Sequence, residues 1–312
     1  MLNIYTHLDC MLHVPGENHP ESPLRLSRVL ESLNTLSDTV FIDAVEATDE
    51  QILLFHTEEY LNRLKELIPT EKGVTVKTDE DTSVCSTSLV AARKAAGAVC
   101  QAATDVVNGI TRRAFCAIRP PGHHALPDTS MGFCVFGNVA IGAAYAQRLG
   151  MKRVAIVDFD VHHGNGTQKL AEVNSEVLMV SLHQCPLWPW SGEPEEGGDN
   201  VLNIPLAPYT PREEYMRLFR EEVLPKLKEF NPDIIFVSAG FDAHLEDPPK
   251  EKLFNDPPGY QSLIDDDYAE LAKILRQSAE ELCEGRLVAV LEGGYNVDVL
   301  SKACRAFVKE LI

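Results

Sequence analysis

Five short apolar runs recur along the chain, and longer stretches with helical spacing separate them. The runs lie at 112–118, 154–160, 177–183, 234–240 and 287–293. Apolar residues recur every three or four positions at 85–107, 136–149, 212–229, 265–284 and 297–311. The short runs predict buried strands and the spaced stretches predict helices. Strands that alternate with helices predict an α/β fold, with a parallel sheet that right-handed crossovers cover on both faces.

The chain shows no Gly/Ser-rich linker, low-complexity tract or internal repeat, so we expect a single domain over residues 1–312. A hydrophobic content of 45% is typical of a globular protein with a sizeable core. Two segments depart from the pattern. Residues 13–25 are polar and proline-rich, and 245–260 contain four prolines and are long for an α/β connection. Each segment is either a rim over a site or passive surface, and the sequence does not choose between them.

The composition is acidic, with 28 Lys and Arg against 47 Asp and Glu and a formal net charge of −19. Such a charge disfavours the nucleic-acid backbone, so we expect no direct nucleic-acid binding. It would attract cationic substrates such as lysine side chains or polyamines, although solubility explains the charge equally well. The eight cysteines show no C-x-x-C pair, which predicts free thiols in a reducing compartment. Without a secretory leader or an apolar run of about 18 residues, a cytoplasmic location and no membrane association are expected. Self-association stays open.

The segment 154–168, VAIVDFDVHHGNGTQ, carries the densest chemistry of the chain. A buried strand runs into Asp158, Asp160 and His162, which can project the same way because side chains alternate along a strand. The carboxyl end of a parallel strand is where open α/β sheets place their ligands. Two carboxylates and an imidazole there suit a divalent metal ion. A chance polar strand end is the weaker alternative, because aspartates and histidines fill four of six successive positions.

The other four apolar runs also end in polar or reactive residues. These endings are RPPGHHA at 119–125, SLH at 181–183, AGFDAH at 239–244 and EGGYN at 292–296. Five such endings on neighbouring strands would line one crevice at the carboxyl edge of the sheet. Ordinary loop composition rarely produces that coincidence, so the sequence predicts an active site there.

The ordered strings RPPGHHA, MGFCVFGNVAIGAA, VDFDVHHGNGTQ, VSLH, SAGFDAHLEDP and LEGGYN resemble the zinc-dependent histone deacetylase superfamily. That superfamily includes acetylpolyamine amidohydrolases and bacterial histone-deacetylase-like amidohydrolases. The resemblance extends from 19–26 to 293–296, and N-G-T-Q and F-G-N look closer to the class II and bacterial branch. It implies an arginase/deacetylase fold with a parallel sheet of about eight strands.

By this resemblance, one Zn²⁺ ion is assigned to Asp160, His162 and Asp242. Three protein ligands leave a coordination position open, as a catalytic rather than structural zinc site requires. The binuclear-manganese ureohydrolases share this fold ancestry, but they carry a further aspartate where this chain has His244. A single metal ion is therefore favoured.

The resemblance gives catalytic roles to His123, His124 and Tyr295. His124 would be the general base and later the acid that protonates the leaving amine, with His123 as its tandem partner. An imidazole suits this work because its ordinary pKa is about 6.5. Tyr295 would donate a hydrogen bond to the tetrahedral oxyanion. In isolation, a histidine pair is more often a surface feature and a tyrosine after a strand more often packs in the core, but the surrounding motifs favour catalysis.

The family pattern pairs Asp158 with His123 and residue 165 with His124. Many relatives have aspartate at the second place, whereas this chain has Asn165. A neutral amide stabilises an imidazolium less than a carboxylate does, which predicts a lower pKa for His124. The resemblance further implies a K⁺ ion close to the zinc ion, held by Asp158, the Ser181 hydroxyl and the backbone carbonyls of Asp160, His162 and Leu182.

A lysine-like substrate also needs a narrow apolar tunnel for its methylene groups. Gly132 and Phe133 match one wall, and Trp188 stands where relatives usually have phenylalanine. Asp81, or its neighbour Asp79, is expected to accept a hydrogen bond from the substrate backbone.

The sequence therefore predicts a zinc-dependent hydrolase that removes an acetyl or other acyl group from acyl-lysine in proteins or peptides. An acetylpolyamine or small-amide deacetylase and a longer-chain lysine deacylase stay open as alternatives. Polyamine specificity lacks support, because polyamine-specific relatives often have an acidic residue where this chain has Pro249. A catalytically silent acyl-lysine binding module is disfavoured, because every proposed ligand, base and oxyanion donor is present.

Overall fold

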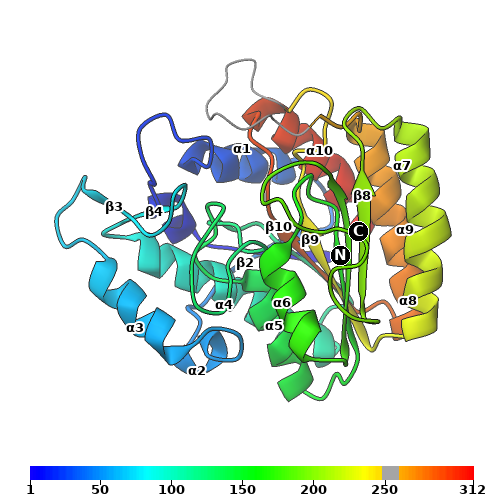
Figure 1. Ribbon diagram of the computed structural model, residues 1–312, viewed down its shortest axis with the longest axis horizontal. Helices are drawn as coiled ribbons and strands as arrows, with labels where there is room; N and C mark the ends of the chain where they lie inside the picture. Colours follow the sequence, from blue (N-terminus) through cyan, green and yellow to red (C-terminus); the bar gives the residue numbers. More distant parts are fainter. Residues whose placement is uncertain (248–259) are drawn as a thin grey trace.

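The centre of the molecule is an eight-stranded parallel sheet in the order β2-β1-β5-β10-β9-β6-β7-β8 (Figure 1). The computed structural model describes residues 1–247 and 260–312. The strands are β1 (Leu2–Thr6), β2 (Thr39–Asp43), β5 (Arg113–Cys116), β6 (Val154–Asp158), β7 (Val177–Gln184), β8 (Val201–Leu206), β9 (Ile234–Ala239) and β10 (Leu287–Leu291). Every residue of β6, β7, β9 and β10 is buried, which explains why these strands are continuous apolar runs. The predicted fold class is confirmed.

Helices cover both faces of this sheet (Figure 1). Helices α1, α10 and α9 pack side by side in one layer, and α4 and α5 pack against each other in another. The helices are α1 (Pro23–Leu33), α2 (Asp49–Ile52), α3 (Glu58–Leu67), α4 (Ser88–Val107), α5 (Asn138–Arg148), α6 (Asn165–Val173), α7 (Arg212–Leu218), α8 (Leu224–Phe230), α9 (Asp265–Cys283) and α10 (Val297–Leu311). A short 3₁₀ helix, η1 (Leu8–Leu12), follows β1, and a small hairpin joins β3 (Thr75–Lys77) to β4 (Ser83–Cys85).

The five predicted strands and five predicted helices all form, but their ends differ. The expected helix at 85–107 begins only at Ser88, because residues 83–85 pair in the β3–β4 hairpin. The expected helix at 212–229 contains a π-helical turn, η2 (Phe219–Val223), between α7 and α8. The periodicity misses three of the eight strands, β1, β2 and β8. The residues of the edge strand β2 are exposed or half-buried, so its apolar side chains form no continuous run.

The segment 13–25 is not passive surface. Its Glu21 carboxylate is fully buried and accepts hydrogen bonds from Arg119 at 2.7 and 2.6 Å and from Arg25 at 3.2 Å. Burial would raise the pKa of Glu21, but the Arg119 and Arg25 guanidinium groups outweigh it and hold that pKa at about 2. Arg25 also donates to the backbone carbonyls of Glu292 at 2.5 Å and Gly294 at 2.6 Å. The segment thus anchors the loop that follows β10. Of the other proline-rich segment, residues 248–259 lie outside the described residues.

All eight cysteines are free, and seven of them are buried. This agrees with the absence of a C-x-x-C pair. Within residues 1–247 and 260–312, no helix has both the length and the apolar character needed to cross a membrane.

Candidate active site

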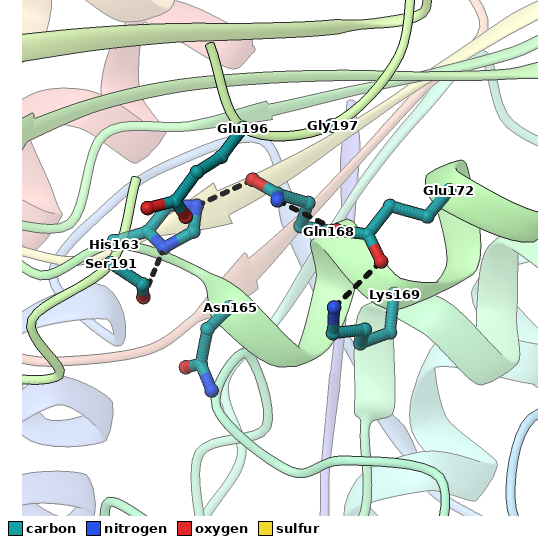
Figure 2. A pocket seen from close by; sticks show the side chains of 8 residues that line it. All are labelled: His163, Asn165, Gln168, Lys169, Glu172, Ser191, Glu196 and Gly197. Atoms are coloured by element: carbon teal, nitrogen blue, oxygen red, sulfur yellow. Dashed lines mark hydrogen bonds and ion pairs between the residues drawn. The ribbon is translucent and has the colours of Figure 1, made fainter. Parts of the chain in front are cut away.

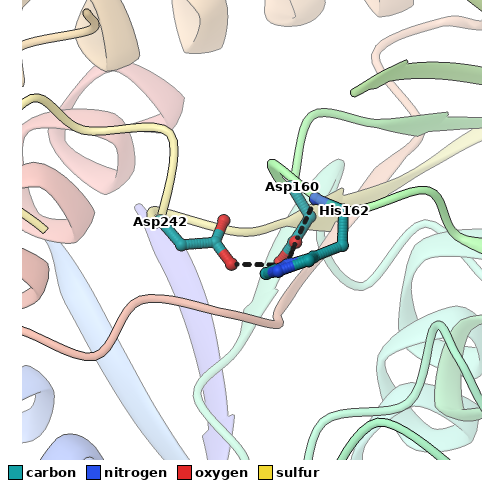
Figure 3. Close-up of side chains that lie close together, drawn as sticks. All are labelled: Asp160, His162 and Asp242. Carbon is teal, nitrogen blue, oxygen red and sulfur yellow. Dashed lines mark hydrogen bonds and ion pairs between the residues drawn. The ribbon is translucent and has the colours of Figure 1, made fainter. Parts of the chain in front are cut away.

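Three side chains from two neighbouring strands meet at the carboxyl edge of the sheet. Asp160 and His162 follow β6, and Asp242 follows β9. Nδ1 of His162 lies 3.0 Å from Oδ1 of Asp160 and 3.2 Å from Oδ2 of Asp242 (Figure 3). One ligand atom from each residue lies within 4.8 Å of the others. The structure therefore brings together the three residues that the sequence selects as metal ligands.

The chemistry of this triad fits a zinc ion. Asp160 and Asp242 are buried, and hydrogen bonds from the backbone N–H groups of Gly293 and Val161, both at 2.9 Å, hold their carboxylates. Burial would lower the pKa of His162, yet the two facing carboxylates raise it to about 10. That shift reports a strongly negative potential, which a bound cation would compensate. Two oxygens and one nitrogen form a three-ligand set of the catalytic zinc type.

The histidine pair lies in the loop after β5, and its rings are 3.9 Å apart. Nδ1 of His123 is 2.9 Å from Oδ2 of Asp158, and Nδ1 of His124 is 2.8 Å from Oδ1 of Asn165. The structure therefore forms both pairings that the family pattern implies. A proton on Nδ1 of His124 leaves Nε2 as the lone-pair nitrogen, which is the form that a general base needs.

The two histidines have opposite charge preferences. Burial lowers the pKa of His124 well below its ordinary value, and the neighbouring His123 lowers it further. Burial would also lower the pKa of His123, but Asp160 and Asp158 outweigh it and raise that pKa to about 10. The surroundings therefore favour the charged form of His123 and the neutral form of His124.

Asn165→Asp is expected to move the acidic limb of the pH profile of kcat/KM to higher pH by about one unit. A carboxylate 2.8 Å from Nδ1 would stabilise the His124 imidazolium, so its pKa would rise and more acid-side activity would be lost. Rates measured from pH 5 to 9 on both enzymes check this, with Asn108→Asp on the C-cap of α4 as the control. An unchanged acidic limb would contradict the prediction.

Tyr295 lies in the loop after β10, where Gly294 adopts a φ of +117°. This left-handed conformation strains residues other than glycine. The ring of Tyr295 is 5.8 Å from that of Phe133, and the Arg25 guanidinium carbon is 5.0 Å from its centroid. Burial raises the pKa of the Tyr295 phenol well above its ordinary value. The phenol therefore keeps its proton and is available as a hydrogen-bond donor.

Aromatic side chains surround the approach to these groups. The Trp188 ring is 4.6 Å from that of His124 and 6.2 Å from that of His162. A side chain at Gly132 would collide with both His124 and Trp188, so only glycine fits between them. The Phe133 ring lies 5.8 Å from that of Tyr295, so the predicted wall residues lie beside the histidine pair and the proposed oxyanion donor.

Asp81 holds the loop that carries Gly132 and Phe133. Its Oδ1 accepts hydrogen bonds from the backbone N–H of Gly132 at 2.9 Å and from the Thr82 hydroxyl at 3.0 Å. The structure thus gives Asp81 a contact with the protein backbone, and its contact with a substrate backbone stays a prediction.

The expected K⁺ residues also lie together. Asp158 and Ser181 are register partners on β6 and β7, and the Ser181 hydroxyl lies 3.0 Å from Nδ1 of His183. Leu182 is fully buried next in line. The K⁺ ion itself stays a prediction.

A polar cavity of about 240 Å³ lies beside the site (Figure 2). Its lining consists of His163, Asn165, Gln168, Lys169, Glu172, Ser191, Glu196 and Gly197. Nδ1 of His163 is 2.8 Å from the Ser191 hydroxyl, and Nε2 is 2.8 Å from the Gln168 side-chain oxygen. Both ring nitrogens of His163 are therefore occupied within the protein, so His163 is no metal ligand here, although it neighbours His162.

The sequence did not predict a role for two buried carboxylates, Glu292 and Asp247. Oε2 of Glu292 accepts hydrogen bonds from the backbone N–H groups of Gly122 at 2.7 Å and His123 at 3.2 Å. Asp247 makes a similar contact with the Tyr295 loop. Both residues lie within motifs that resemble the family, LEGGYN and SAGFDAHLEDP. A hydrogen bond to a distant backbone N–H leaves no pattern in the sequence, however, so their contacts could not be predicted.

An α/β sheet that gathers a candidate metal triad, a histidine pair and a tyrosine at its carboxyl edge has an arrangement typical of hydrolases. A family model described as the histone deacetylase domain matches residues 19–311. The chain belongs to the histone deacetylase family.

Relatives of this chain include proteins named as deacetylases and as amidohydrolases. It is 38% identical to a probable deacetylase of Archaeoglobus fulgidus, over 95% of this chain and 81% of that protein. It is 36% identical to a histone deacetylase-like amidohydrolase of Pseudomonas aeruginosa, over 94% and 76%. The crystal structure of the HDA15 HD domain matches with a TM-score of 0.88 and 33% identity, over 99% of this chain and 88% of that one.

Proposed function

We propose that the protein is a zinc-dependent hydrolase that removes an acetyl or other acyl group from the amino nitrogen of acyl-lysine in proteins or peptides. The observation that carries this proposal is the position of His124, whose ring lies 5.8 Å from that of the metal-site residue His162 and whose Nδ1 lies 2.8 Å from Oδ1 of Asn165. A base held neutral beside a three-ligand metal site is what amide hydrolysis by water requires. The names of the relatives support the reaction type.

In this proposal Asp160, His162 and Asp242 hold the zinc ion, which when bound supplies Lewis-acid polarisation of the substrate carbonyl. His124 accepts the proton of the attacking water at Nε2 and returns it to the leaving amine. The imidazolium of His123, held by Asp158, offsets the negative charge that develops nearby. The Tyr295 phenol donates a hydrogen bond to the oxyanion.

The surroundings of the site favour an extended amine over a compact amide. Phe133 and Trp188 supply aromatic walls of the kind that enclose a chain of methylene groups. The formal net charge of −19 favours the approach of a cationic protein or peptide. Both features also suit polyamines, so the substrate class is the part of the proposal that needs a direct comparison.

The test is a substrate panel assayed with the holoenzyme: acetyl-lysine peptides, longer acyl-lysine peptides and acetylated polyamines. We expect the highest kcat/KM on an acyl-lysine peptide, one zinc ion per chain by elemental analysis, and loss of activity on chelation that zinc restores. A preference for acetylpolyamines would contradict the substrate class. With metal bound, inactivity on every substrate would overturn the hydrolase in favour of a binding module, and two metal ions per chain would contradict the single-metal site.

A further inference from the structure

The Tyr295 loop is held from outside its own strand. Arg25 binds the carbonyls of Glu292 and Gly294, and the N–H of Gly293 donates to Asp160 at 2.9 Å. These contacts hold the first half of the loop, up to Gly294. The direction of the phenol depends on the backbone at Tyr295 itself, which none of these three hydrogen bonds reaches.

A single carboxylate oxygen fixes the second half of the loop. Oδ1 of Asp247 accepts hydrogen bonds from the backbone N–H groups of Tyr295 at 2.7 Å and Asn296 at 2.9 Å. Asp247 is only 2% exposed, so water competes little for these bonds. The side-chain amide of Asn296 also donates to the Glu246 carbonyl at 2.8 Å, which joins the same two loops.

Asp247 is in turn tied to the metal triad. The backbone N–H of Asp247 donates to the His244 carbonyl at 3.0 Å, and the N–H of His244 donates to the Phe241 carbonyl at 3.3 Å. Two backbone hydrogen bonds join Leu263 to this turn. The Leu263 N–H donates to the Ala243 carbonyl at 3.2 Å, and the Leu245 N–H donates to the Leu263 carbonyl at 2.8 Å. The turn that begins with the ligand Asp242 therefore ends, five residues later, on the backbone of Tyr295.

We propose that Asp247 is a positioning residue that sets the distance between the metal triad and the Tyr295 phenol. The inference rests on the proposed function, because it takes Tyr295 to be the oxyanion donor. Two consecutive N–H groups bound to one oxygen fix the backbone on both sides of the Tyr295 Cα, and hence the direction of its side chain. A hydrogen bond to an oxyanion tolerates little displacement, and a shift of about 1 Å can cost about 10²-fold in rate.

The test compares two variants that both lack the Asp247 carboxyl group. Asp247→Asn keeps an oxygen that can accept both N–H groups, whereas Asp247→Leu has a similar shape and no acceptor. On an acetyl-lysine peptide, we expect Asp247→Leu to lower kcat by about 10–10²-fold with little change in KM, and Asp247→Asn to stay within about threefold of wild type. Glu246→Gln, which removes a charge from the exposed neighbouring side chain, is the control and is expected to leave kcat unchanged.

A double-variant comparison shows whether Asp247 acts through Tyr295. When the phenol hydroxyl is already absent, in Tyr295→Phe, the further change Asp247→Leu is expected to add less than about twofold. An equal loss in both backgrounds would mean that Asp247 acts elsewhere, and it would overturn the proposal. Wild-type kcat in Asp247→Leu would do the same.

Hydrogen exchange of the zinc-loaded protein supplies a readout that does not depend on activity. The Tyr295 and Asn296 amides should exchange slowly in wild type and Asp247→Asn and at least tenfold faster in Asp247→Leu, while the Gly293 amide stays protected. Unchanged exchange at Tyr295 would overturn the proposal even if the enzyme were inactive on every amide, so this arm separates it from the proposed function. Should Asp247→Leu fail to fold, Asp247→Ala removes the same acceptor without added bulk.

Discussion

His124→Ala is expected to lower kcat/KM for an acyl-lysine peptide by about 10²–10⁴-fold while the protein keeps its zinc ion. The neutral His124 ring is the base of the proposed mechanism, and it is not among the three residues of the metal cluster. Its removal should therefore separate chemistry from metal binding. Steady-state kinetics and elemental analysis of the same purified sample check both parts.

Two comparisons make this result specific. His162→Ala should lose both zinc and activity, because it removes a proposed ligand. His7→Ala changes a half-buried histidine that caps η1, and it is expected to stay within about twofold of wild type. Zinc loss in His124→Ala, or a rate within tenfold of wild type, would contradict the role of His124 as the base.

Tyr295→Phe is expected to lower kcat by about 10²–10³-fold, the usual cost of one missing oxyanion donor. KM should change little, because the hydrogen bond strengthens only as negative charge develops on the carbonyl oxygen. The change removes one oxygen atom and leaves the contacts of the ring with Phe133 and Arg25 in place. Stopped assays over a range of substrate concentrations separate kcat from KM.

The matched control for this variant is Tyr209→Phe, which removes the hydroxyl of a tyrosine that is 65% exposed. Its kcat should equal that of wild type. If the effect of Tyr295→Phe fell entirely on KM, Tyr295 would be a substrate-binding residue and not an oxyanion donor.

The sequence predicts the residues at the centre of the site well, but it does not predict the residues that hold the surrounding loops in place. Asp158 is the last residue of β6, and Asp160 and His162 follow at intervals of two residues, so the position of this one strand end brings them close together. Asp242 is 80 residues from His162, and its selection as the third ligand came from the family resemblance. Arg25, Asp247 and Glu292 act on backbone groups of distant loops. Because a backbone N–H or carbonyl is the same in every residue, no pattern of side chains reveals these contacts.

The same reasoning explains the errors in the fold. Strands β6, β7, β9 and β10 are buried on both faces, so their apolar runs are unbroken. The edge strand β2 exposes much of its surface and lacks that signal. Helix α6 begins at Asn165, inside the metal motif. The glycines on both sides of Asn165 are typical of a turn, so the sequence does not predict that a helix begins there.

The position of β10 has a consequence for how this enzyme is made. The last strand in the chain lies in the middle of the sheet, between β5 and β9, and it divides the other strands into groups of three and four. Until residues 287–291 leave the ribosome, each group has an open edge where β10 will insert, and such edges invite aggregation. The proposed metal ligands after β6 and β9 then belong to one group of strands, whereas the histidine pair after β5 belongs to the other. The two parts of the site therefore come together only when β10 joins the two groups of strands.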